Sequence, residues 1–164
     1  MSTTAFDPLR ILKRLDEHRV RFVIIGGIAG RLWGSTTVTN DLDVCYARDA
    51  ENLNALAAAL ADLKVKLRGV DRDLPFVADA RTLKTGDHFT FSTNAGSFDI
   101  LGTPAGSNGY ESLARTATAM DVGGLTVLVA AIEDLILMKR AAGRPKDLIE
   151  VEVLSAVREE LGKD

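Results

Sequence analysis

Hydrophobic residues recur along the chain in short stretches, some with helical spacing and others with the compact pattern of strands. Leu9, Leu12 and Leu15 recur at helical spacing, which predicts a helix from about Pro8 to about His18. The stretch Arg21–Ile25 (RFVII) is short, apolar and β-branched, and two glycines follow it. This pattern predicts a buried strand that ends in a turn.

The rest of the chain alternates between the same two patterns. Further helices are expected at Gly27–Trp33, Ala50–Leu63, Tyr110–Thr116, Ile132–Ala142 and Pro145–Leu161. Further strands are expected at Asp41–Tyr46, Lys64–Val70, His88–Thr93, Ser97–Leu101, Ala119–Val122 and Leu125–Val129.

Turn residues connect the last four of these strands. Asn94-Ala95-Gly96 and Gly123-Gly124 each predict an antiparallel hairpin, whereas Asp71–Asp87 has no clear period and is predicted to be a long loop. The order of elements predicts an α+β fold with a mixed sheet covered by helices. We expect one domain over residues 1–164, in which residues 130–164 form a closing helical segment.

Composition and charge narrow the class of protein. Of the 164 residues, 46% are hydrophobic and 26% are charged, which is typical of a folded globular domain. The net charge of −3 disfavours nonspecific coating of nucleic acid, which requires a basic excess. Two local basic groups remain, and on charge alone both are interpreted as solvated surface. They are Lys64, Lys66, Arg68 and Arg72, and Lys139, Arg140, Arg144 and Lys146.

The cellular compartment is predicted from three features that the sequence lacks: a pair of cysteines, a signal peptide and a long apolar stretch. Cys45 is the single cysteine and cannot form an intramolecular disulfide, and the first residues lack the pattern of a signal peptide. The longest apolar stretches, Phe22–Ile25 and Leu125–Ile132, are far shorter than the roughly 20 residues that span a bilayer. We therefore predict a cytoplasmic protein with no membrane role.

Three aspartates on predicted strands are the strongest sign of chemistry. Asp41 and Asp43 lie two residues apart and project from the same face of one strand, where their mutual repulsion requires compensation. The side chain of Asp99 likewise projects from the face of its strand that is opposite the apolar side chains. Oxygen-only ligands suit Mg²⁺ or Mn²⁺, and no His/Cys spacing favours zinc. Asp99 is also compatible with an ordinary hairpin residue.

A glycine pair precedes the first two aspartates. Gly26-Gly27 lies between a predicted strand and a predicted helix, where backbone N–H groups and the helix N-terminus favour a phosphate. A dinucleotide-binding fingerprint is disfavoured, because Ile25 stands where that fingerprint needs a glycine and the chain lacks a run of further parallel strands.

These motifs resemble a known family. IIGG at 24–27 followed by DLDV at 41–44 resembles the nucleotidyltransferase signature of the DNA polymerase β superfamily. The tail LILMKRAAGRPKDLIEVEVL (135–154) is similar to AbiEii-like and MenT-like nucleotidyltransferase toxins of toxin–antitoxin systems. The resemblance implies a nucleotidyltransferase-like sheet with C-terminal helices, two metal ions held by three aspartates and, in some members, transfer to tRNA 3′ ends.

Carried over by position, the resemblance assigns a role to each motif residue. Asp41, Asp43 and Asp99 are the expected catalytic and metal-binding residues, and Gly26, Gly27, Ser35, Lys139, Arg144 and Lys146 the expected nucleotide-binding residues. Asp147 belongs to the same GRPKD run. One departure is Thr37, where relatives often carry an arginine, and Arg31 is the candidate replacement.

The expected function is transfer of a nucleoside monophosphate from an NTP to an acceptor hydroxyl. The acceptor suggested by the resemblance is RNA, such as a tRNA 3′ end, and a cognate antitoxin is the suggested protein partner. Two alternatives remain open at this point. One is a non-catalytic antitoxin or regulatory module with the same fold, and the other is an adenylyltransferase that modifies small molecules.

Overall fold

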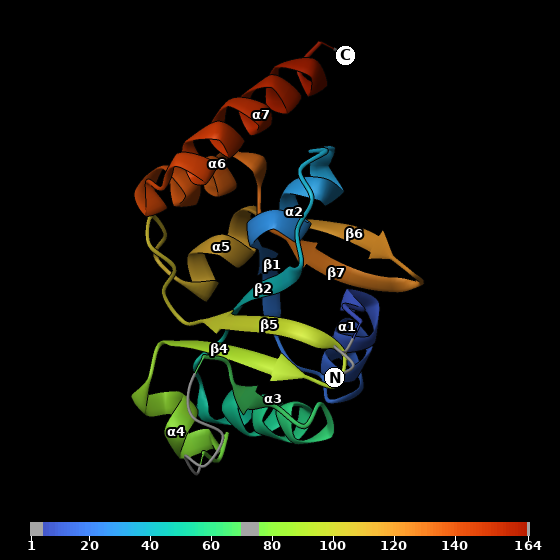
Figure 1. Ribbon diagram of the computed structural model, residues 1–164, viewed down its shortest axis with the longest axis vertical. Coiled ribbons are helices and arrows are strands. Elements are labelled where there is room, and N and C mark those ends of the chain that lie inside the picture. Colours follow the sequence, from blue (N-terminus) through green and yellow to red (C-terminus); the bar gives the residue numbers. More distant parts are fainter. Residues whose placement is uncertain (1–4, 70–75, 164) are drawn as a thin grey trace.

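A computed structural model describes residues 5–69 and 76–163 of the chain. Its centre is a seven-stranded mixed sheet with the strand order β3-β4-β5-β2-β1-β7-β6 (Figure 1). The strands are β1 (Phe22–Ile25), β2 (Asp41–Tyr46), β3 (Lys66–Leu67), β4 (His88–Thr93), β5 (Gly96–Leu101), β6 (Thr118–Val122) and β7 (Leu125–Val129). The mixed sheet confirms the predicted α+β fold.

Seven helices are seen in the described residues, and they surround the sheet. They are α1 (Pro8–Glu17), α2 (Gly26–Trp33), α3 (Ala50–Asp62), α4 (Ala80–Thr85), α5 (Tyr110–Thr116), α6 (Ile132–Ala142) and α7 (Pro145–Leu161). Figure 1 shows α6 and α7 at one end of the molecule and α3 and α4 at the other. The expected C-terminal helices are therefore present as a pair of helices joined at Gly143, which has φ 68°.

The strand pairing brings distant parts of the chain together at the centre of the sheet. β2 pairs with β1 in antiparallel and with β5 in parallel orientation, and both predicted hairpins, β4–β5 and β6–β7, are present. In the parallel pair, Asp43 lies directly opposite Asp99. The two carboxylates that the sequence places on separate strands are consequently neighbours.

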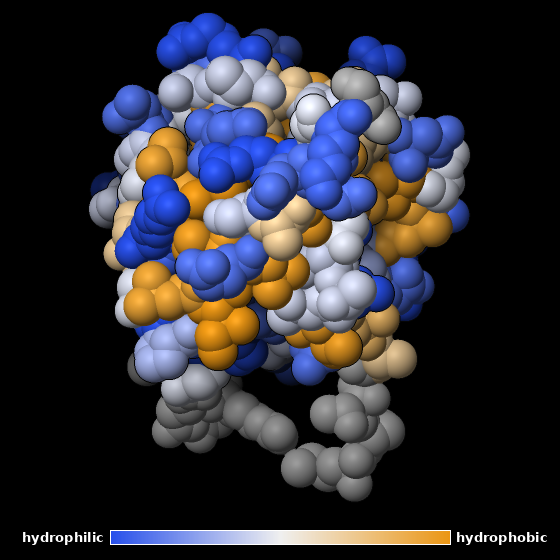
Figure 2. Space-filling view, turned by 90° about the horizontal axis from the view of Figure 1, so that it is seen from above, coloured by the Kyte–Doolittle hydropathy of each residue, from blue (hydrophilic) through white to orange (hydrophobic). Residues whose placement is uncertain are grey.

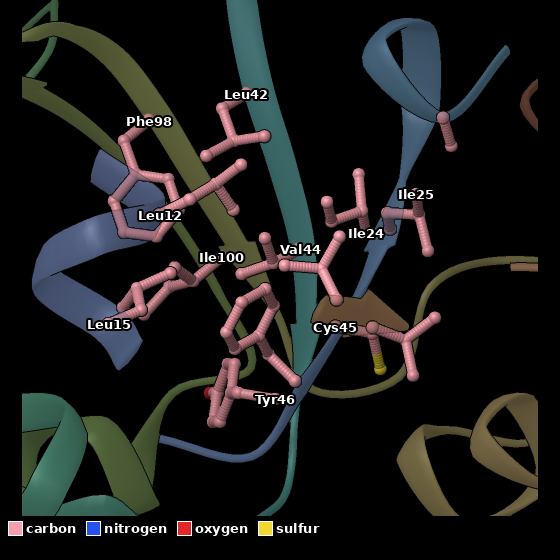
Figure 3. Packing of buried hydrophobic residues seen from close by; sticks show 14 of the residues in the cluster. Leu12, Leu15, Ile24, Ile25, Leu42, Val44, Cys45, Tyr46, Phe98 and Ile100 are labelled. Carbon is pink, nitrogen blue, oxygen red and sulfur yellow. The ribbon is translucent and has the colours of Figure 1, made fainter. Parts of the chain in front are cut away.

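Apolar side chains that pack on one face of the sheet hold the strands in this arrangement. Leu42 of β2, Phe98 and Ile100 of β5, and Leu12 and Leu15 of α1 are all fully or almost fully buried and lie together in Figure 3. Because successive strand residues face opposite sides, packing of this face directs the intervening aspartates to the other one. The core thereby positions the polar residues.

Two elements differ from the sequence prediction. The segment expected to be a loop contains α4, a helix too short for periodicity to reveal, whose first turn is capped by Asp79 accepting a hydrogen bond from the Thr82 N–H at 2.8 Å. The strand expected at Lys64–Val70 is only Lys66–Leu67 long, because Lys64 adopts φ 52° and ends α3 in a turn. Residues 70–75 of these two predictions lie outside the described residues.

The C-terminal helices carry an uneven surface. Leu137, Leu148 and Ile149 are exposed to 50%, 50% and 65%, and Figure 2, seen from the α7 end, shows apolar patches interleaved with hydrophilic ones.

Within 5–69 and 76–163, no helix has the length and apolar character to cross a membrane.

Candidate active site

A cavity of about 450 Å³ lies between the sheet and the C-terminal helices. Predicted site residues line it from two sides. They are Gly26, Asp43 and Asp99 from the sheet side, and Lys139 of α6, Arg144 at the N-cap of α7 and Asp147 of α7. Cationic side chains on one wall therefore face carboxylates on the other, across a space of the size that small ligands occupy.

Asp43 is the most strongly perturbed residue in this cavity. Burial, the negative charges of Asp99 and Asp41, and a side-chain hydrogen bond with Asp99 raise the pKa of Asp43 to about 7, against a smaller opposing effect of Lys139. A hydrogen bond between two carboxyl groups requires a proton on one of them. Without a metal ion, a proton held by the pair near neutral pH therefore relieves the repulsion between the two carboxylates.

The chemistry of this pair fits a hard divalent cation, although the third aspartate is not gathered with it. Asp43 and Asp99 offer oxygen atoms at one place, and Asp41 adds negative charge from two residues away on the same face. Asp41 does not line the cavity. Among the described residues, no three His, Cys, Asp or Glu side chains are arranged to hold one metal ion. The pair would bind a cation, with Asp41 as a nearby charge.

Gly26 makes the position of Asp43 possible. Its φ is +71°, and a Cβ atom at this residue would lie 2.1 Å from Asp43 Oδ2. A Cβ at Gly27 would lie 2.8 Å from the Thr39 side chain, which belongs to the loop entering β2. No side chain caps the first turn of α2, which begins at Gly26. The glycine pair thus packs the start of a helix directly against the carboxylate strand.

Asp147 organises the cationic wall. Its side chain is only 1% exposed, and it accepts hydrogen bonds from Arg144 Nε at 2.6 Å and Nη2 at 3.2 Å. Lys139 Nζ lies 3.5 Å from Asp147 Oδ1. Burial acts to raise the pKa of Asp147, but the hydrogen bonds from Arg144 and the charge of Lys139 outweigh it and lower this pKa. Asp147 therefore stays ionised and holds both cations beside the cavity.

Other predicted residues lie elsewhere. Ser35 is buried, and its hydroxyl donates to Glu150 Oε1 at 2.7 Å. Lys146 is exposed on the first turn of α7, and neither it nor Gly27 nor Ser35 lines the cavity. Arg31 donates to the carbonyl oxygens of Thr36 and Thr37, at 3.3 and 3.1 Å. The structure does not bring these side chains together with the carboxylate pair, and their nucleotide-binding roles stay predictions.

Arg68 is a site residue that the sequence did not single out. Its Nη2 donates to Asp99 Oδ1 at 2.8 Å and its Nη1 donates to the Phe91 carbonyl oxygen at 3.0 Å. The sequence interpretation placed Arg68 on a solvated basic surface with Lys64, Lys66 and Arg72, and this is wrong for Arg68. Only the register of β3, β4 and β5 reveals the contact. Arg72 lies outside the described residues.

Cys45 shares the face of the aspartates but is not poised to react. It is fully buried, and its Sγ lies 3.4 Å from the Gly102 carbonyl oxygen. Burial, with a small effect of Asp87, raises the pKa of its thiol to about 12. Cys45 is therefore a small buried residue of the core and not a nucleophile, since a thiol with this pKa is protonated at neutral pH.

Comparison with solved structures supports the fold. The chain superposes on the lincosamide antibiotic adenylyltransferase LnuA, in its lincomycin-bound form, with a TM-score of 0.62 and 12% identity over 94% of this chain and 99% of that one. It superposes on the antibiotic-resistance factor ANT(2'')-Ia with a TM-score of 0.56 and 18% identity over 94% and 82%. At these identities the likeness establishes the architecture alone.

Sequence comparison supplies the family. No curated protein matches the chain. Residues 6–161, almost the whole length, match the family described as "Nucleotidyltransferase of unknown function (DUF6036)". The match covers the glycine pair, all three aspartates and both C-terminal helices. The chain therefore belongs to this family of nucleotidyltransferases.

Proposed function

We propose that the chain is a metal-dependent enzyme that transfers a nucleoside monophosphate from an NTP to a hydroxyl group of an acceptor. One observation carries the proposal. Asp43 and Asp99 lie side by side on the sheet, beneath the start of α2 at Gly26, and face a cavity whose other wall holds Lys139 and Arg144. This is an arrangement for binding a cation and a polyphosphate together.

The carboxylates would hold Mg²⁺, or Mn²⁺ in its place. Asp43 and Asp99 are the proposed direct ligands, and Asp41 is the proposed third acidic residue. When bound, the metal supplies charge neutralisation at the phosphates and acidifies the attacking hydroxyl. The proton-sharing contact between Asp43 and Asp99 is consistent with a site that is completed by a cation.

The triphosphate would lie between the glycine pair and the cationic wall. Backbone N–H groups at Gly26 and Gly27 begin α2 and are suited to a phosphate. Lys139 and Arg144, both held by Asp147, would neutralise the phosphates that leave. Ser35 and Lys146 are retained as more distant predicted contacts with the nucleotide.

The proposed reaction is a single displacement at the α-phosphorus. The acceptor oxygen forms the new bond to this phosphorus, the bond from the phosphorus to the bridging oxygen of the β-phosphate breaks, and pyrophosphate leaves. The proton of the hydroxyl passes to a carboxylate at its side of the cavity, for which Asp99 is the candidate. Atoms and charge balance without a redox partner.

Two classes of acceptor are supported by different observations. The resemblance of the tail to toxin nucleotidyltransferases supports RNA, such as a tRNA 3′ end, and a toxin role with a cognate antitoxin. The fold likeness to LnuA and ANT(2'')-Ia supports a small-molecule hydroxyl, because these proteins are an antibiotic adenylyltransferase and an antibiotic-resistance factor. Both classes belong in the test.

Labelled nucleotides provide that test. The full chain is incubated with Mg²⁺ and each of four α-labelled NTPs, against total tRNA and against a panel of small hydroxyl compounds that includes lincomycin. We expect a labelled product from one acceptor class, and its loss in Asp43→Asn. If no acceptor is labelled, or if Asp43→Asn labels as well as the unchanged protein, the proposed function is wrong.

A further inference from the structure

The carboxylate pair has a cationic neighbour that comes from the edge of the sheet. Arg68 follows β3, the edge strand, which lies beside β4 (Figure 1). Its side chain reaches past β4 to Asp99 on β5. Asp43 lies on β2, on the other side of β5. Asp99 is therefore held between Arg68 on one side and Asp43 on the other.

Arg68 is fixed in this place by groups other than Asp99. Its backbone N–H donates to the Thr90 carbonyl oxygen at 2.9 Å, and its Nη1 donates to the Phe91 carbonyl oxygen at 3.0 Å. Its side chain is 33% exposed, and that of Asp99 is 14% exposed. A guanidinium tied to the main chain of β4 and largely shielded from water keeps its charge close to Asp99.

The charges around the cavity nearly balance without a metal. The carboxylates are Asp41, Asp43, Asp87, Asp99 and Asp147, and the cations are Arg48, which pairs with Asp87 at 3.0 Å, Arg68, Lys139 and Arg144. When all are ionised, one negative charge remains in excess. Such a site attracts a doubly charged ion only weakly, because each nearby fixed cation opposes it. The triphosphate of an NTP brings the negative charge that the site lacks.

We propose that Arg68 is the resident counter-charge of the carboxylate pair, and that it makes firm binding of the divalent cation depend on the nucleotide. This inference rests on the proposed function, since it concerns the same metal site. Arg68 weakens binding of the ion alone, so the ion and the nucleotide occupy the site together. One oxygen of Asp99 stays with Arg68, and the other is left for the cavity.

Manganese binding to the full chain tests this proposal without any turnover. Free Mn²⁺ is measured by electron paramagnetic resonance during titration of the protein, alone and with α,β-methylene ATP, a nucleotide that cannot transfer its nucleoside monophosphate. Arg68→Met and Arg68→Gln remove the charge, the first keeping the apolar stem and the second keeping a hydrogen-bond donor. Arg68→Lys keeps the charge, and Lys66→Met removes an exposed cation two residues earlier, on β3.

We expect Arg68→Met and Arg68→Gln to bind Mn²⁺ alone roughly tenfold more tightly than the unchanged protein, as loss of a nearby like charge requires. The tightening produced by the nucleotide should shrink by the same factor. Arg68→Lys and Lys66→Met should resemble the unchanged protein in both measurements. Two charge-removing variants are used so that poor folding of one leaves the comparison intact.

The outcomes separate failure of this inference from failure of the proposed function. If Asp43→Asn abolishes Mn²⁺ binding but Arg68→Met and Arg68→Gln bind it equally or more weakly than the unchanged protein, Arg68 is not a counter-charge to the metal, and the inference is wrong. If Asp43→Asn leaves Mn²⁺ binding unchanged, or if no protein binds Mn²⁺ with the nucleotide, the metal site and the proposed function fail together.

Discussion

Gly26 and Asp43 are so close that a side chain on the first would occupy the place of the carboxylate on the second. The Cβ of an alanine at Gly26 would lie 2.1 Å from Asp43 Oδ2 and 2.9 Å from its Cγ, at a residue with φ +71°. We predict that Gly26→Ala displaces Asp43 and lowers nucleotide transfer at least about a hundredfold, since small misplacements at a reacting centre have effects of this order. Steady-state transfer of labelled nucleotide measures this.

A control variant separates the displacement from backbone strain. Gly124, in the β6–β7 turn, also has positive φ, at +88°, and nothing lies within 4 Å of its Cβ position. Both alanine variants should lose about 1–3 kcal/mol of unfolding free energy through strain, as non-glycine residues in this region do. Only Gly26→Ala should lose transfer activity. Equal losses of activity in the two variants would mean that backbone strain, and not the contact with Asp43, is the reason that residue 26 must be glycine.

The raised pKa of Asp43 predicts how stability varies with pH when no metal is added. In the folded protein this pKa is about 7, against an ordinary value of 3.8. Between these values the folded state binds more protons than the unfolded state, so this group's contribution to stability falls as pH rises from about 4 to about 7 and stays low above it. Up to about 4 kcal/mol is involved, at 1.36 kcal/mol for each pKa unit.

Asp43→Asn removes this contribution. In the presence of EDTA, the variant should be more stable than the unchanged protein at pH 8, with a difference that shrinks towards pH 4. Urea unfolding at pH 4, 5, 6, 7 and 8 measures it. Mg²⁺ in large excess, which overcomes its weak binding without nucleotide, should stabilise the unchanged protein at pH 8 and leave the variant almost unaffected, since a cation replaces the proton. Parallel pH profiles for the two proteins would contradict the assignment of a buried, destabilising charge to Asp43.

Asp147 should control nucleotide binding more than the chemical step. It is the shared partner of Lys139, at 3.5 Å, and of Arg144, at 2.6 Å. We predict that Asp147→Asn raises the KM for the NTP by about tenfold or more through loss of the orientation of both cations, with a smaller change in kcat. Kinetics with each substrate varied in turn measure this. A change confined to the KM of the acceptor would show that the cationic wall does not bind the triphosphate.

Much of the site could be predicted because its residues interrupt strong patterns. Asp43 and Asp99 alternate with apolar residues on strands, so the hydrophobic face that packs on α1 fixes where they point. Gly26 was marked by its place between a strand and a helix. Such features follow from local periodicity, which the sequence shows directly.

The residues that were missed depend on pairing between distant elements. Arg68 reaches Asp99 only because β4 lies between β3 and β5, and nothing near Arg68 in the sequence indicates this order. Ser35 is predicted to bind nucleotide, and the structure adds a partner that the sequence does not reveal, because the Ser35 hydroxyl donates to Glu150 of the last helix. A polar side chain in a loop has many partners available, and tertiary structure selects among them.

Glu150 leads to the last prediction, because it ties α7 to the loop before the aspartate strand. Its side chain is buried, and it accepts hydrogen bonds from the hydroxyl groups of Ser35, at 2.7 Å, and Thr37, at 2.6 Å. Hydrogen bonds to a charged group contribute about 1.5–3 kcal/mol each, so loss of both in Glu150→Ala should lower the unfolding free energy by about 3–6 kcal/mol. The loop 35–40 should also exchange its amide hydrogens faster, as measured by mass spectrometry.

Two further variants show whether the carboxylate itself is required. Glu150→Gln keeps the shape but places an NH₂ group, which cannot accept a hydrogen bond, against one hydroxyl, so its effect on exchange should lie between those of Glu150→Ala and the unchanged protein. Ser35→Ala removes one donor and should resemble Glu150→Gln. Glu150→Ala could instead lower stability and leave amide exchange in the loop unchanged. Glu150 would then only support the packing of α7, because loss of its hydrogen bonds to the loop must raise the rate of exchange there.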